Sequence, residues 1–183
     1  MEAYVYLRVA PGRVSEVMNR LSTSNGVRRA VTVVGEWDVM ALVEGGDLSS
    51  IAQLVLSQLH PMEGVTRTYT APVVPSDRIG IGWGMQATTP VPIGDACFVH
   101  VKAEAGAVAG LVERLSESDE ISGLAVLGGR FDLIVAIPQP WEIASGVIIE
   151  QLHGLPGVLS TETLVAIRYE EPDEDRDQFS AWD

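Results

Sequence analysis

The sequence predicts an α+β fold in which one strand–helix–strand–strand–helix–strand unit occurs twice. The first observation is an internal repeat, because segment 3–74 recurs as segment 97–167 after a single deletion. The second is the order of the hydrophobic patterns, which switch between the periods of strands and helices in the same way in both segments. The third is the length of the repeat, which is that of a whole domain and exceeds the ~20–50 residues of a solenoid unit. We therefore expect one chain to carry what a homodimer would carry.

The first half of each unit is predicted to be a strand, a glycine turn and a helix. The strands are 4–9 and 98–103, where β-branched and aromatic residues follow an alternating pattern. Gly12 and Gly106 mark the turns that follow them. Each helix is indicated by apolar residues at i, i+3, i+4 and i+7, which share one face. These positions are Val14, Val17, Met18 and Leu21 in the first copy and Val108, Leu111, Val112 and Leu115 in the second.

The second half of each unit is predicted to be a hairpin, a helix and a last strand. The strands are 27–34, 37–43 and 65–74 in the first copy and 121–127, 131–137 and 158–169 in the second. Pro61 and Pro156 follow the ends of the helices. Helices that return over one face of an antiparallel sheet give a ferredoxin-like βαββαβ unit. We assign residues 1–74 to the first repeat, 75–95 to a linker rich in glycine and proline, 96–169 to the second repeat and 170–183 to an acidic tail.

The composition restricts the partners and the compartment. The 183 residues carry a net charge of −13, with 25 acidic against 12 basic side chains. Binding to duplex DNA needs clustered cations, and because none occur here we expect no direct contact with nucleic acid. No apolar run approaches the ~18 residues of a membrane span, so we expect no membrane contact. The single cysteine excludes an intrachain disulfide and is typical of a reducing, cytoplasmic setting.

The first strand of each copy has one aliphatic face and one mixed face. The mixed face carries Tyr4, Tyr6 and Arg8 in the first copy and Phe98, His100 and Lys102 in the second. This face would be covered if the two sheets faced each other and formed a barrel. The residues would then fill the space between the sheets, with Arg8 and Lys102 reaching the rim. Alternatively, Arg8, His100 or Lys102 would contact a small ligand inside.

The hairpin between the second and third strands is a second candidate site. It consists of Gly35-Glu36-Trp37-Asp38 in the first copy and Gly129-Arg130-Phe131-Asp132 in the second. Glycine allows positive φ and leaves its N–H open to an anion. Asp38 and Asp132 can accept a hydrogen bond from the ammonium group of a ligand, so each hairpin suits a zwitterion. The alternative is that each aspartate stabilises its own turn.

The order of these motifs resembles the effector-binding domain of the Lrp/AsnC family, also called the RAM domain. The resemblance rests on Gly12, Gly26-Val27, the hairpin Gly35–Asp38 and Gly64-Val65-Thr66-Arg67-Thr68 of the first copy, and the second copy is more divergent. It implies a ferredoxin-like fold whose two sheets pair as a dimeric α+β barrel, here within one chain. In the family this domain assembles dimers into rings and binds small effectors, often amino acids, near subunit contacts. This role transfers to Gly35, Asp38, Gly129 and Asp132.

The leading hypothesis is therefore a non-enzymatic effector-binding and assembly module. Its expected partners are a small-molecule effector and either further copies of itself or full-length Lrp/AsnC-type regulators. We expect no DNA-binding activity of its own and no cofactor. Because the first copy lies closer to the family pattern, we expect its hairpin to be more sensitive to substitution. The alternative is a dimeric α+β barrel enzyme, either a cofactor-free oxygenase or isomerase or a haem enzyme with His100 as the axial ligand.

Overall fold

The computed structural model describes residues 1–75 and 96–167, and both copies have the predicted order of elements. The first copy comprises β1 (Glu2–Val9), α1 (Val14–Thr23), β2 (Val27–Val34), β3 (Val39–Glu44), α2 (Leu48–Leu54), its π-helical continuation η1 (Val55–Leu59) and β4 (Val65–Pro72). The second comprises β5 (Cys97–Ala103), α4 (Val108–Ser116), β6 (Gly123–Val126), β7 (Leu133–Ile137), α5 (Trp141–Gly146), its continuation η2 (Val147–Leu152) and β8 (Val158–Ile167). The proposed linker, except for residue 75, and the acidic tail lie outside the described residues.

The strands form one 8-stranded antiparallel sheet in the order β4-β1-β3-β2-β8-β5-β7-β6. The two copies join where β2 pairs with β8, with Thr32 opposite Ile167. At the other edge, Val73 bridges to Leu127, and the Val74 amide donates to the Val126 carbonyl at 2.9 Å. Each junction joins the second strand of one copy to the last strand of the other, so the two junctions are equivalent and the sheet closes around an approximate two-fold axis. The predicted tandem ferredoxin-like repeats and intrachain α+β barrel are confirmed.

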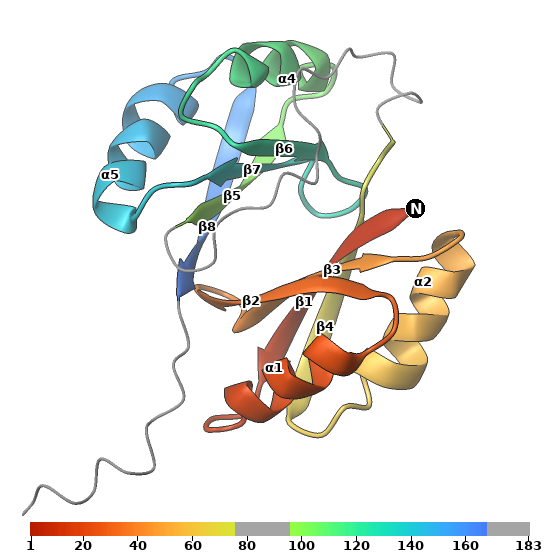
Figure 1. Cartoon of the computed structure of the whole chain (residues 1–183). Coiled ribbons are helices and arrows are strands. Elements are labelled where there is room, and N and C mark those ends of the chain that lie inside the picture. Colours follow the sequence, from red (N-terminus) through yellow and green to blue (C-terminus); the bar gives the residue numbers. More distant parts are fainter. Residues whose placement is uncertain (76–95, 168–183) are drawn as a thin grey trace, which may run out of the picture.

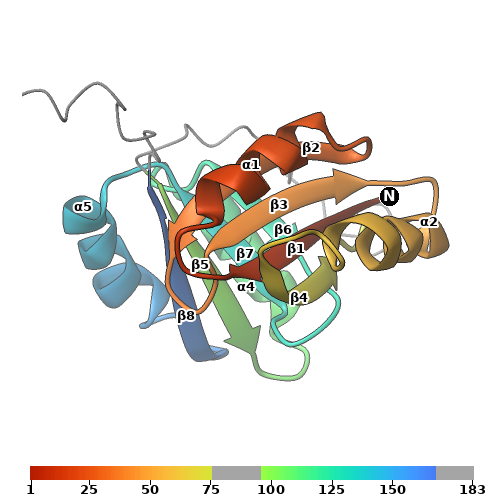
Figure 2. The ribbon, with the colours of Figure 1, turned by 90° about the horizontal axis from the view of Figure 1, so that it is seen from below.

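The helices lie on the outer faces of the two half-sheets (Figures 1 and 2). The aliphatic face of each first strand packs under them, with Val5 and Leu7 in one outer core and Val99 and Val101 in the other. A third core fills the barrel between the half-sheets. Its buried members are Tyr6, Val33, Trp37, Met40, Ala71, Val73, Ala96, Phe98, Ala125, Leu127, Ile134, Ala136, Leu164 and Ala166. The mixed face of each first strand is therefore covered, as the alternation predicted.

The elements differ from the predicted bounds mainly at the hairpins. The third strands begin at Val39 and Leu133, two residues later than expected. Residues 37–38 and 131–132 turn toward the first strand of their own copy instead. The amide of Asp38 donates to the Leu7 carbonyl, and the amide of Asp132 donates to the Val101 carbonyl. Strand β6 covers Gly123–Val126 and is shorter than the predicted 121–127. No helix within the described residues is long and apolar enough to span a membrane.

Candidate functional site

Equivalent residues of the two copies meet in pairs across the approximate two-fold axis. The hydroxyl of Tyr6 lies 2.6 Å from Nε2 of His100, and Nη1 of Arg130 lies 2.8 Å from Oε2 of Glu36. In both pairs the partners are 94 residues apart, which is the spacing of the repeat. A homodimer would place identical residues opposite each other near such an axis. In this chain the two pairs consist of different residues, a tyrosine with a histidine and a glutamate with an arginine.

The predicted aspartates hold the ends of the first strands. Oδ2 of Asp38 accepts from the Val9 amide at 2.8 Å, and Oδ2 of Asp132 accepts from the Ala103 amide at 2.9 Å. At these amides the pairing of β1 with β4, and of β5 with β8, shifts register. A register shift leaves a backbone group outside the regular ladder, and the carboxylate satisfies it. Each aspartate therefore stabilises the neighbouring strand, and its role toward a ligand stays a prediction.

Replacing either aspartate with alanine should lower stability, since it leaves a strand amide without its charged acceptor. We expect Asp38→Ala and Asp132→Ala each to cost about 1–2 kcal/mol, below the upper range for such bonds because both carboxylates are partly exposed. Asp38→Asn and Asp132→Asn keep an acceptor oxygen and should recover much of this loss. Urea denaturation at neutral pH measures the effect. Equal stability of the alanine variants and the unmodified protein would show that these amides do not need the carboxylate.

The two predicted glycines lie where the copies approach each other closely. Gly129 has a φ of +142°, and a Cβ atom there would lie 2.4 Å from the Tyr69 hydroxyl of the first copy. Gly35 has a φ of +150°, and its Cβ would lie 2.6 Å from Cδ2 of Leu164 in the second copy. The Tyr69 hydroxyl also accepts from the Arg130 amide at 2.7 Å. Glycine is therefore needed for the contact between the copies as well as for the turn.

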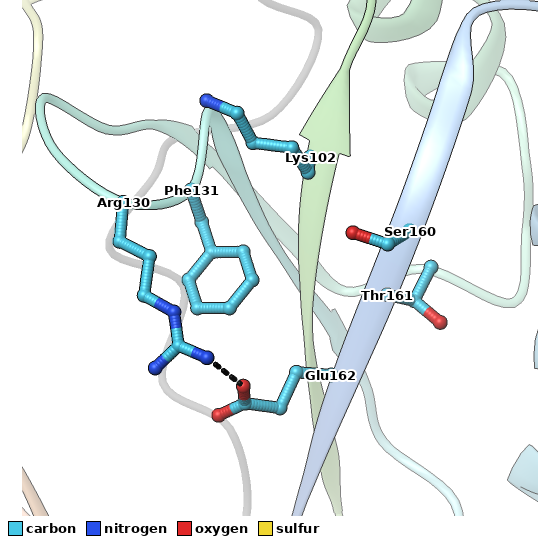
Figure 3. A pocket seen from close by; sticks show the side chains of 6 residues that line it. All are labelled: Lys102, Arg130, Phe131, Ser160, Thr161 and Glu162. Carbon is cyan, nitrogen blue, oxygen red and sulfur yellow. Dashed lines mark ion pairs between the residues drawn. The ribbon is translucent and has the colours of Figure 1, made fainter.

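A cavity of about 350 Å³ lies beside the second hairpin. Its lining residues are Lys102, Arg130, Phe131, Ser160, Thr161 and Glu162. In Figure 3, Arg130 and Phe131 come from the hairpin, while Ser160 and Glu162 point toward them from β8. The side chain of Thr161 points to the other face, where its hydroxyl lies 2.7 Å from Nε2 of His153. The cavity thus combines two cations, a hydroxyl, an aromatic ring and a carboxyl group.

The charges around the cavity are arranged about Arg130. Its Nη1 contacts Glu36 at 2.8 Å and its Nη2 contacts Glu162 at 3.3 Å. Burial and the nearby charge of Glu36 raise the pKa of Glu162. Burial acts to raise the pKa of Glu36 as well, but the hydrogen bond and charge of Arg130 outweigh it and lower that pKa. Glu162 therefore holds a proton more tightly than Glu36.

The other predicted residues have different positions. Lys102 lines the cavity and pairs with Asp132 at 2.9 Å. Arg8 lies at the corresponding rim of the first copy, 3.5 Å from Asp38. His100 is 2% exposed and stacks on Phe131 with ring centres 4.9 Å apart, so it lies behind the cavity in the barrel core. Burial lowers its pKa to about 4.

Sequence reasoning missed the residues that β8 contributes to the site. Ser160 and Glu162 were not predicted, because neither belongs to a short motif. The sequence nevertheless contained a sign of their importance. In the alignment of the two copies, Ser160 corresponds to Arg67 and Glu162 corresponds to Tyr69. At both positions the two copies differ in size and in charge.

The barrel, with a polar cavity at its rim, is an α+β fold of the ferredoxin-like type. Residues 2–76 match the family model described as Lrp/AsnC ligand binding domain. The first repeat is therefore similar to the Lrp/AsnC ligand-binding domain, in agreement with the resemblance found in its motifs.

One of the similar solved structures aligns with nearly the whole chain, and others align with a smaller part of it. The siroheme decarboxylase NirDL in co-complex with an iron-uroporphyrin III analogue aligns over 92% of this chain and 71% of its own, with a TM-score of 0.65 and 10% identity. This similarity spans both copies and supports the shared barrel fold. The hypothetical protein PHS023 from Pyrococcus horikoshii aligns over 38% of this chain and 83% of its own, with 29% identity and a TM-score of 0.36. AsnC of E. coli covers 54% of this chain and 68% of its own, with 14% identity and a TM-score of 0.39. No curated protein matches the chain.

Proposed function

We propose that this protein is a regulatory module that binds a small amino acid or a related metabolite in the cavity beside the second hairpin. The observation that carries this proposal is the mixed lining of the cavity. Lys102 and Arg130 offer positive charge to a carboxylate, and Ser160 offers a hydroxyl beside them. Glu162 offers a carboxyl group to an ammonium group. Such a set suits the two ends of a zwitterion.

The match of the first repeat to a ligand-binding domain supports a regulatory role over a catalytic one. As part of the same proposal, the module has no DNA-binding activity of its own, in keeping with its net charge of −13. Its partners would be further copies of the chain or full-length regulators of the Lrp/AsnC type. Light scattering with and without an effector tests the first of these assemblies.

The haem-enzyme alternative draws less support from the residues present. His100 was its proposed axial ligand, but the ring is buried and its Nε2 is hydrogen-bonded to Tyr6 at 2.6 Å. The space between the half-sheets is filled by the third core, which includes Trp37, Phe98 and Leu164. A haem at His100 would have to displace these side chains. Among the described residues, no group of three or more His, Cys, Asp or Glu side chains could hold a metal ion.

A thermal-shift screen with the proteinogenic L-amino acids and their α-keto acids tests the proposed function, and titration calorimetry then gives the affinity of each hit. Lys102→Met should weaken binding of a hit by about one to two decades, because it removes one charge-assisted hydrogen bond worth roughly 1.5–3 kcal/mol. Arg20→Met is the control, since Arg20 lies on α1 and pairs with Glu16 outside the cavity. Equal affinity of both variants for a hit would place its site elsewhere. A screen without any hit would count against an amino-acid effector.

A further inference from the structure

The two copies can be compared residue by residue beside the cavity. His60 at the end of η1 lies 3.0 Å from the Thr68 hydroxyl, and His153 at the end of η2 lies 2.7 Å from the Thr161 hydroxyl. These matching contacts fix the correspondence between β4 and β8. The residue before Thr161 is Ser160, which lines the cavity, and its counterpart before Thr68 is Arg67.

Arg67 lies at the corresponding place in the first copy, where its side chain is 63% exposed. Its guanidinium carbon lies 4.8 Å from the ring centre of Trp37, which is the counterpart of Phe131. Its Nη1 lies 3.8 Å from Oε1 of Glu36, which is the counterpart of Arg130. The side chain thus crosses from β4 to the first hairpin and ends on an aromatic face beside a carboxylate, an arrangement that stabilises a cation. Serine is too short to make this crossing. In the second copy Ser160 lines the cavity, and it is the guanidinium of Arg130, from the hairpin itself, that lies 5.0 Å from the ring centre of Phe131.

We propose that each chain has one ligand site, in the second copy, and that Arg67 is a built-in occupant of the corresponding position in the first copy. This inference rests on the proposed function and adds its stoichiometry and the residue that sets it. The residue at position 67 determines whether the first copy has room for a ligand beside its hairpin, and the residue at position 160 determines this for the second copy. The hairpin of the second copy is then the more sensitive one, opposite to the expectation from family likeness. A tandem chain of this kind is a receptor with one site where a homodimer would have two.

Exchange of the two residues tests this inference with the L-amino acids as probes. Calorimetry should give one bound molecule of any hit per unmodified chain and none for Ser160→Arg, whose new side chain would occupy the cavity. Arg28→Ser is the matched control, because Arg28 pairs with Glu2 on the surface and should leave one site. Two molecules per unmodified chain, or undiminished binding to Ser160→Arg, would overturn the inference.

Crystal structures of the two single variants provide a measurement that does not depend on a ligand. Arg67→Ser should open a cavity between β4 and the first hairpin, and Ser160→Arg should close the one beside the second. If Trp37 and Tyr69 collapse into the space left by Arg67, the inference is wrong even when an amino acid binds. If no amino acid binds but the cavities exchange as expected, the proposed effector class fails while the asymmetry between the copies stands.

Discussion

The free energy of unfolding should fall by about 3 kcal/mol between pH 6.5 and pH 4 through His100 alone. Burial lowers the pKa of this histidine from 6.5 to about 4, and the side chain is 2% exposed. In this pH window the unfolded chain binds a proton that the folded chain does not, so acidification favours unfolding. The pKa lies about two and a half units below its ordinary value, and at about 1.4 kcal/mol per unit most of the corresponding energy, about 3 kcal/mol, is lost within this window. The stabilising contribution is complete above pH 6.5 and is lost as the pH falls through the window.

Urea denaturation at a series of pH values should compare the unmodified protein with His100→Gln. Glutamine keeps an acceptor for the Tyr6 hydroxyl but does not titrate, so the difference between the two curves isolates the histidine. The comparison is needed because Glu162 acts in the opposite direction. Its pKa is raised by burial, so its ionisation disfavours the folded state as the pH rises. Parallel curves for the two proteins from pH 6.5 to pH 4 would mean that His100 is not held neutral by the fold.

The barrel could be predicted because its cause lies in local patterns. Along β1, the alternation of Val5 and Leu7 with Tyr4 and Tyr6 requires that both faces be covered. The helices of each copy cover the aliphatic face of its sheet. The mixed face is covered by the sheet of the other copy. The meeting of Tyr6 with His100 then follows from the approximate two-fold axis, and each is the other's counterpart in the repeat.

The details of the site depend on contacts between the copies, which local patterns do not contain. Asp38 was expected to serve a ligand or its own turn, but its carboxylate holds the Val9 amide at a register shift. Alternation does not reveal such a shift, because it depends on the pairing with the neighbouring strand. The cavity likewise depends on where Arg67 places its guanidinium. Differences between the copies at such positions were the available signal, whereas the resemblance drew attention to what the copies share.

Gly129→Ala should destabilise the protein by about 3 kcal/mol, which is more than alanine at another glycine with positive φ. The backbone at Gly129 has a φ of +142°, a region that side chains rarely adopt and that costs about 1–3 kcal/mol. In addition, the new methyl group would lie 2.4 Å from the Tyr69 hydroxyl and displace it from the Arg130 amide. Gly12→Ala is the control, because Gly12 has a φ of +78° and nothing within 4 Å of the added atom. We expect the control to cost about 1–2 kcal/mol, from backbone strain alone.

A double-mutant cycle with Tyr69→Phe separates the two contributions at Gly129. Tyr69→Phe alone should cost about 1 kcal/mol, since it removes the acceptor of the Arg130 amide. In the Tyr69→Phe background the hydroxyl that meets the new methyl group is gone, so Gly129→Ala should cost less than it does alone. Residues in direct contact give such non-additive energies, and chemical denaturation of the four proteins measures the coupling. Additive losses would mean that Gly129 serves only the turn. A coupling of about 1 kcal/mol would show that this glycine also serves the contact by which the first copy holds the hairpin of the second.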